Sequence, residues 1–184
     1  MASHLPAIFR RLQALVFDKL PATFDIHSTN LFDRWHIGPE LAGDIEGEQG
    51  QAAKPFLNAI VVSPVEPGEE PGDLAEATGK WTEPFDVLFI YRRGPDLLAV
   101  IETWGDPLHD ILCQRQLRRL DNLTFHDSNG RKTGHVTGYR VAGPPDFYSE
   151  ADNDALYGLG LACFRIRVEV ELMTLLDPEY RARS

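Results

Sequence analysis

The chain has 184 residues, of which 43% are hydrophobic and 25% are charged, and its formal net charge is −10 at pH 7. This length and composition predict a single globular domain with one buried core over residues 1–184. The negative charge argues against nonspecific binding to nucleic acid or to an anionic membrane as the main activity.

The two cysteines, Cys113 and Cys163, show no CxxC spacing and no neighbouring Cys/His cluster. They therefore do not predict a disulfide framework, and we expect the protein to be made in a reducing cytoplasm.

The first predicted element is an amphipathic helix over residues 5–20. Its apolar residues recur at spacings of three and four, whereas Arg10, Arg11 and Asp18 fall on the opposite face. Pro21 ends the helix. Because charged residues interrupt the apolar ones, we expect a helix that packs on a sheet, and neither a signal peptide nor a membrane span.

Two long acidic loops flank the next strand. Residues 22–55 are predicted to be irregular, and residues 43–53 (GDIEGEQGQAA) form the first acidic loop. Residues 56–62 (FLNAIVV) are a nearly continuous apolar run and predict a buried strand. Residues 63–79 are rich in proline, glycine and glutamate and predict the second loop.

The middle of the chain predicts a strand followed by a helix and a hairpin. Residues 80–93 alternate as a strand, and Asp96 is placed as the N-cap of a helix that Gly105 and Pro107 bend or split. Short strands are predicted at residues 122–125 and 135–141, with a strong turn signal (DSNG) between them and a polar connection at residues 144–153.

The clearest pattern is a long strand over residues 161–175. From residue 164 onward apolar side chains alternate with Arg165, Arg167, Glu169 and Glu171. A strand of this length spans about 45 to 50 Å and exceeds the usual five or six residues. Its charged face has two readings: solvated charges matched by an antiparallel neighbour strand, or part of a contact with another subunit.

The sequence contains no metal-binding, phosphate-binding or nucleophile motif that we recognise, so we predict neither a cofactor nor an enzyme. One arrangement keeps a nuclease open as an alternative. In that reading Asp86 on a strand and Glu102 further along would be the two carboxylates that hold a magnesium ion, but Trp104 stands where such a pattern places lysine.

The order of these elements resembles the tail terminator proteins of long-tailed bacteriophages, of the minor-tail-protein-U and tail-completion type. The stretches that carry the resemblance are LPAIFRRLQALVFDKL, WTEPFDVLFIYRRGPDLLAVIETW and DFYSEADNDALYGLGLACFRIRVEVEL. The two acidic loops and residues 115–140 depart from the family's pattern.

The resemblance implies an α+β fold, a mixed and mainly antiparallel sheet with helices packed on one face. It also implies a virion protein at the head–tail junction, assembled in the host cytoplasm. Such a protein forms a ring, expected to be a hexamer, that caps the tail tube protein, meets the head-side connector or stopper protein and lets DNA pass through its lumen. Another neck ring protein, a head-completion or stopper subunit, is the alternative within this class.

Residues for these contacts follow from the pattern of charge. The subunit-interface candidates are Arg165, Arg167, Glu169 and Glu171 on the last strand. The loop or lumen candidates are Glu46, Glu48, Glu66, Glu69 and Glu70. An acidic lumen is expected to let a DNA duplex slide without being captured, because like charges repel.

Overall fold

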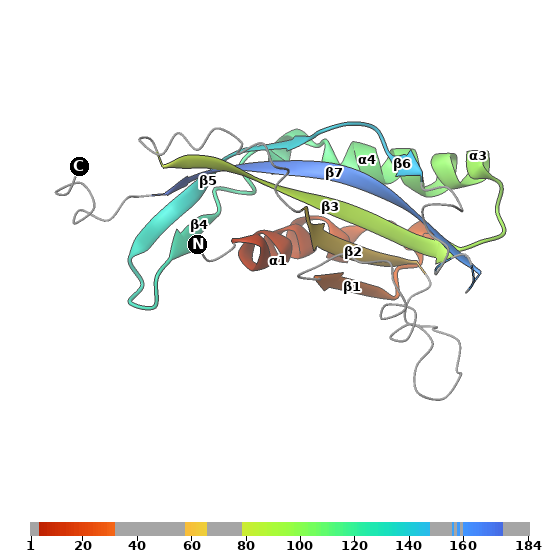
Figure 1. The fold of residues 1–184 in the computed structure, drawn as a ribbon, viewed down its shortest axis with the longest axis horizontal. Helices are drawn as coiled ribbons and strands as arrows, with labels where there is room; N and C mark the ends of the chain where they lie inside the picture. Colours follow the sequence, from red (N-terminus) through yellow and green to blue (C-terminus); the bar gives the residue numbers. More distant parts are fainter. Residues whose placement is uncertain are drawn as a thin grey trace, which may run out of the picture.

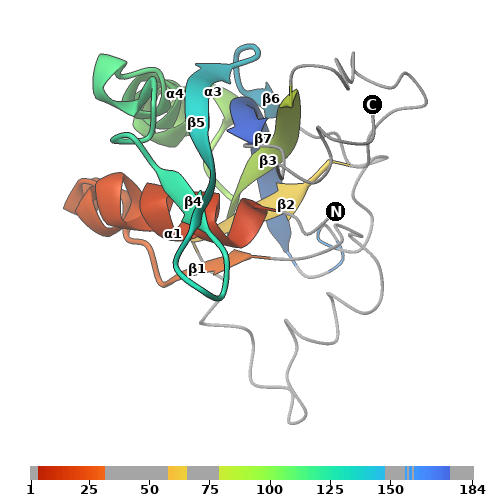
Figure 2. The same ribbon diagram turned by 90° about the vertical axis from the view of Figure 1, so that its left-hand side faces the viewer.

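The computed structural model describes residues 4–31, 58–65, 79–147, 156, 158 and 160–174. Within these residues one sheet has the strand order β1-β2-β3-β7-β5-β4, and β6 pairs with another part of β7 (Figure 1). β1 runs parallel to β2, and the other pairings are antiparallel. Figure 2 shows the helices α1, α3 and α4 on the same side of β3 and β7. The predicted α+β fold is confirmed.

The helical segments are α1 (Leu5–Leu15), η1 (Phe17–Lys19), η2 (Ala22–Phe24), α3 (Leu97–Val100), the π-helical turn η4 (Ile101–Gly105), α4 (Asp106–Leu112) and η5 (Arg115–Leu117). The strands are β1 (Ser28–Leu31), β2 (Ala59–Pro64), β3 (Lys80–Arg92), β4 (Thr124–His126), β5 (Lys132–Val141), β6 (Asp146–Phe147) and β7 (Leu161–Thr174). The predicted strands are all present, whereas β1 and β6 were not predicted.

The two longest strands, β3 and β7, form the centre of the sheet. They have 13 and 14 residues and pair without interruption from Lys80↔Met173 to Arg92↔Leu161. Period-two alternation sends Phe89 of β3 and Phe164 of β7, which face each other, into the core beneath the helices. Their ring centroids lie 5.2 Å apart. The period-two pattern predicted for the last strand is confirmed.

Helix α1 is shorter than predicted. It ends at Leu15, and the chain tightens into η1, so that the adjacent residues Val16 and Phe17 are both buried. A continuous α-helix would place these two neighbours about 100° apart around its axis and would bury one at the expense of the other. The start of α1 is fixed to the sheet because the Leu5 N–H donates to Glu83 Oε1 of β3 at 3.1 Å.

The second helical segment runs from Leu97 to Leu112 through a π-helical turn. Asp96 caps it as predicted: its Oδ1 accepts a hydrogen bond from the Ala99 N–H at 2.8 Å. Where the sequence predicted a bend, the π turn carries Gly105 against Phe147 of β6, and a Cβ on Gly105 would lie 3.0 Å from that ring. The lack of a side chain therefore permits this close approach.

A glycine substitution tests the pairing of β5 with β7. A Cβ at Gly134 would lie 2.7 Å from the backbone oxygen of Met173, whereas a Cβ at Gly143 meets nothing within 4 Å. The strand backbone cannot move away from this clash without breaking the hydrogen bonds between β5 and β7. Gly134→Ala should therefore lower the free energy of unfolding by about 2 kcal/mol. Gly143→Ala is the matched control and should stay within about 0.5 kcal/mol of wild type. Urea denaturation measures both, and equal effects would contradict the close β5–β7 contact.

Candidate functional site on the outer face of the sheet

The face of the sheet that points away from the helices carries the charged residues of β7, and we call it the outer face. Along β7 the side chains of Ile166, Val168 and Val170 are fully buried, and Arg165 and Arg167, which alternate with apolar residues, are only partly buried. The outer face is therefore built by the same alternation that builds the core.

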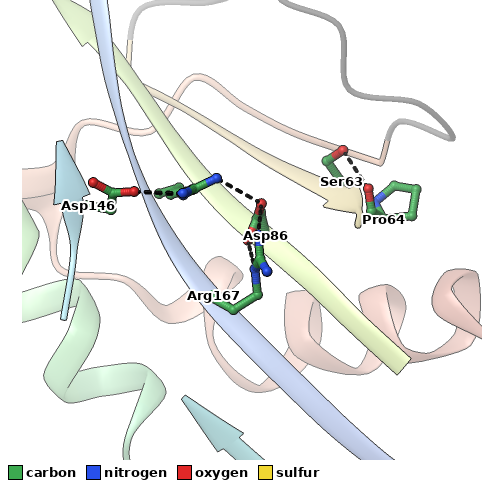
Figure 3. Close-up of polar contacts among 6 residues, drawn as sticks. Ser63, Pro64, Asp86, Asp146 and Arg167 are labelled. Atoms are coloured by element: carbon green, nitrogen blue, oxygen red, sulfur yellow. Dashed lines mark hydrogen bonds and ion pairs between the residues drawn. The ribbon is translucent and has the colours of Figure 1, made fainter. Parts of the chain in front are cut away.

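Asp86 of β3 is the centre of a row of charges on this face. Its carboxylate receives two hydrogen bonds from Arg167, Nε to Oδ1 at 2.5 Å and Nη2 to Oδ2 at 3.2 Å. Arg165 Nη1 approaches Asp86 Oδ2 at 3.9 Å from the other side and also pairs with Asp146 of β6 at 2.8 Å. Figure 3 shows Asp146, Asp86 and Arg167 across three neighbouring strands.

The register explains why these charges meet. Asp86 stands directly opposite Arg167 on β7, and Arg165 is two residues further along β7, on the same face, within diagonal reach. Asp146 stands directly opposite Arg165 from the other side. The side chain of Asp86 is only 13% exposed, so its ion pairs are screened less by solvent than pairs on an open surface.

A second pair lies further along β7. Arg140 of β5 stands opposite Glu169, and its Nε donates to Glu169 Oε2 at 2.7 Å. Glu171 is exposed, and its carboxylate makes no ion pair with a residue that the structure describes. Three of the four interface candidates thus pair with opposite charges on neighbouring strands, which is the first of the two readings that the sequence left open. The fourth candidate, Glu171, has no such pair among the described residues.

The two carboxylates considered for a nuclease lie on different sides of the sheet. Asp86 is on the outer face, held by two arginines, whereas Glu102 is exposed on η4, in the helical layer. In that helical layer, the adjacent Trp104 packs on Phe89 with ring centroids 5.3 Å apart. No group of three or more His, Cys, Asp or Glu residues in the described ranges is arranged to hold a metal ion.

A small cluster at the end of α4 was not singled out from the sequence. Cys113 Sγ lies 3.7 Å from His109 Nε2, and burial and the charge of Asp110 raise the pKa of the thiol. The hydroxyl of Tyr139 is buried and has no hydrogen-bond partner among the described residues, and burial, with a smaller effect of Cys113, raises its pKa strongly. A thiol with a raised pKa stays protonated at neutral pH, so this arrangement does not activate a nucleophile.

The charge of the chain is divided unevenly along the sequence. The described residues hold 14 of the 18 Lys and Arg residues but 13 of the 28 Asp and Glu residues, a net charge of +1 against −10 for the whole chain. The acidity that dominates the composition therefore belongs to residues outside the described ranges. Those residues include the loop candidates Glu46, Glu48, Glu66, Glu69 and Glu70.

Comparisons with known proteins give no family for this chain. No model of a protein family matches the sequence, and no curated protein is significantly similar to it. Among the described residues, no helix is both long enough and apolar enough to span a membrane.

Asp146 and Arg140 are outer-face residues that sequence reasoning missed. Each is an isolated charge in its own segment and acquires its role only from the register that places it opposite Arg165 or Glu169. The arrangement as a whole ties β3, β5 and β6 to β7 through ion pairs.

Removing the central charge of the row tests its contribution to stability. Asp86→Asn keeps the shape of the side chain but leaves Arg167 and Arg165 without their shared carboxylate. We expect the free energy of unfolding to fall by about 2 kcal/mol. Glu169→Gln is the matched control, because its partner Arg140 is 68% exposed, and should lose about 0.5 kcal/mol. Chemical denaturation measures both, and a smaller loss for Asp86→Asn than for the control would contradict a strong, half-buried pair.

Removing the buried hydroxyl of Tyr139 is expected to stabilise the protein, in contrast to the loss of the Asp86 charge. Tyr139→Phe removes a hydroxyl that has no partner among the described residues and should raise the free energy of unfolding by about 1 kcal/mol at neutral pH. Since the folded-state pKa is raised, wild-type stability should fall as the pH rises above the ordinary tyrosine value of 10.0. The variant has no tyrosine hydroxyl to ionise, so its free energy of unfolding should not show this decrease, which amounts to about 1.4 kcal/mol per pH unit. Denaturation curves at pH 7 to 11 measure this, and a destabilised variant at pH 7 would show that the hydroxyl has a partner.

Proposed function

We propose that this protein is a structural subunit of a phage or phage-like particle, a tail terminator that forms a ring at the head–tail junction. In this role it caps the tail tube, meets the head-side connector or stopper and lets DNA pass. It works by shape and self-association and turns over no substrate. Rings of this kind arise when two different surfaces of each subunit meet and the rotation between subunits closes.

The observation that carries the proposal is the fold that the resemblance implies. The predicted first helix, the two strands β2 and β3, the second helical segment and the long last strand follow one another in the order that carries the resemblance, with the helices on one face. The outer face carries the charged residues around Asp86 and Glu169 on the side away from the helices, beside the buried apolar residues Val61, Leu88 and Ile90. Its partly exposed arginines and glutamates suit a polar contact between subunits.

The ion pairs on the outer face limit which residues can be changed to test this contact. Reversing Arg165 and Arg167 would place like charges beside Asp86 and would unfold the subunit as well as weaken any ring. Glu171 avoids this difficulty, because it is exposed and has no ion pair within the described ranges. It lies on the same face, over Gly138 of β5.

No observation favours the nuclease as a second function. Two arginines neutralise Asp86, and the sheet separates it from Glu102. A subunit of another neck ring shares the same surfaces with a tail terminator. The position in the particle distinguishes these two: the end of the tail tube for a terminator, the head-side connector for a head-completion or stopper subunit.

Glu171→Lys tests the ring directly. We expect the wild-type protein to form rings at the ends of tail tubes, and the variant to stay folded while losing at least tenfold in the fraction of capped tubes, because a reversed charge repels its partner across the contact. Negative-stain images and mass photometry with purified tail tubes measure the loss.

Asp18→Lys is the matched control, since Asp18 is also exposed but lies in η1, in the helical layer. Monomers alone in the wild-type sample, at high concentration and with tubes present, would refute the ring. Normal capping by Glu171→Lys would remove this part of the outer face from the contact. Magnesium-dependent DNA cleavage abolished by Glu102→Ala would replace the proposal with the nuclease.

A further inference from the structure

A polar pocket of about 300 Å³ lies at the hairpin end of the sheet, away from the row of charges around Asp86. Its walls come from β4, β5 and the turn that follows η5, and they consist of Arg119, Asn122, Thr124, Lys132, His135, Val136 and Thr137. A volume of this size is at the lower end of the range for small-ligand sites. The pocket falls within residues 115–140, the segment that departs from the tail terminator pattern.

The charge of the pocket is positive, and no carboxylate within the described ranges compensates it. Arg119 and Lys132 make no ion pair with any residue in the described ranges, and no carboxylate lines the cavity. Basic residues continue around it at Arg115, Arg118 and Arg131, and they too have no acidic partner among the described residues. In contrast, the arginines of the outer face are matched with carboxylates.

The two acidic residues of this segment are engaged elsewhere. Asp121 pairs with Arg11 of α1 at 3.4 Å. Asp127 Oδ1 accepts hydrogen bonds from the backbone N–H groups of Asn129 and Arg131 in the hairpin turn. Within the described residues, the positive charge around the pocket therefore has no nearby acidic side chain left to pair with it.

An unusual backbone places the polar groups of the pocket. Leu120, Asp121 and Asn122 adopt left-handed φ values of 43°, 54° and 57° in succession. Each such residue costs about 1 kcal/mol, and strained backbone of this kind persists only where its surroundings hold it. Here the fully buried side chain of Leu120 anchors the run. The run brings Arg119 and Asn122 onto the same cavity as Lys132 of β5.

The donors around the cavity define the class of ligand. Arg119 and Lys132 supply positive charge, and the Asn122 amide and the Thr124 hydroxyl are neutral donors that make no side-chain hydrogen bond with a described residue. His135 also lines the cavity, but its Nδ1 atom is buried and has no hydrogen-bond partner among the described residues. Guanidinium and ammonium groups combined with neutral donors are typical of phosphate recognition.

We propose that this pocket binds a phosphate group, either of a nucleic acid backbone or of a free phosphate compound. Contacts with backbone phosphates are independent of base sequence and allow a protein to slide along DNA. The pocket is inferred from its own geometry and does not depend on ring formation. In a ring through which DNA passes, it would supply a weak contact with the duplex at a defined position on each subunit.

Fluorescence anisotropy with a labelled duplex of about 20 base pairs tests the proposal on the full-length protein. Wild type should bind saturably, with a Kd in the range of about 1 to 100 μM at low salt. Two phosphate contacts predict that binding weakens about tenfold when the salt concentration rises fourfold. Arg119→Glu/Lys132→Glu should weaken binding at least tenfold, and Arg119→Ala by about threefold.

Lys19→Glu/Arg92→Glu is the matched control, because it makes the same change in net charge at two exposed positions that do not line the pocket. It should change the Kd by less than about twofold at moderate salt. Circular dichroism confirms that every variant is folded. Pyrophosphate titrated into the wild-type complex separates the two sources of phosphate: displacement at low millimolar concentration assigns a free phosphate compound, and persistence of the DNA complex assigns the nucleic acid backbone.

Three results would overturn the phosphate pocket. The first is an absence of saturable binding by wild type to both the duplex and pyrophosphate. The second is an equal loss of binding in the pocket variant and the control, which would make the effect one of net charge. The third is tighter binding of a polyglutamate peptide than of the duplex, which would assign the pocket to an acidic protein segment.

Discussion

The antiparallel pairing of β3 with β7 is the constraint on which the rest of the structure depends. Thirteen consecutive registered pairs fix which side chains of both strands face the helices and which face outward. A slip of one residue would expose Phe89 and Phe164 and would bury Asp86 against the helices. The apolar pairs therefore determine the register, and the ion pairs on the other face follow from it. β5 and β6 then add to the free edge of β7 and complete both layers.

This dependence separates two kinds of charge in the molecule. Around Asp86 the charges are matched within the chain and hold neighbouring strands together. At the β4–β5 end the positive charges have no partner among the described residues, and most of the acidic residues lie outside the described ranges. The described residues are nearly neutral in sum and contain a basic pocket, although the chain as a whole is acidic.

Particular elements show how far sequence reasoning reached. β3 and β7 were predicted because their patterns extend over more than ten residues, and Asp96 was predicted as a cap because capping is a local interaction. β1 was missed because its strand character comes from parallel pairing with the distant β2, and α1 was predicted too long because burial of both Val16 and Phe17 overrides helical periodicity. At the outer face Arg165, Arg167 and Glu169 were predicted, and Asp86 was considered only for a nuclease. The pairing of these residues with Asp86, Asp146 and Arg140 was not predicted.

The sequence by itself determined the alternation of the last strand, which depends on neighbours along the chain, and the overall negative charge, which depends on composition alone. The α+β class was expected from the resemblance to a known family. Only the tertiary structure decided which charges neutralise one another, since cross-strand partners such as Asp86 and Arg167 lie 81 positions apart. The same is true of the pocket, whose cations Arg119 and Lys132 meet through a buried left-handed turn and a hairpin. Local sequence patterns determine which side chains share a face of each element, and the register between distant strands determines which of these side chains meet.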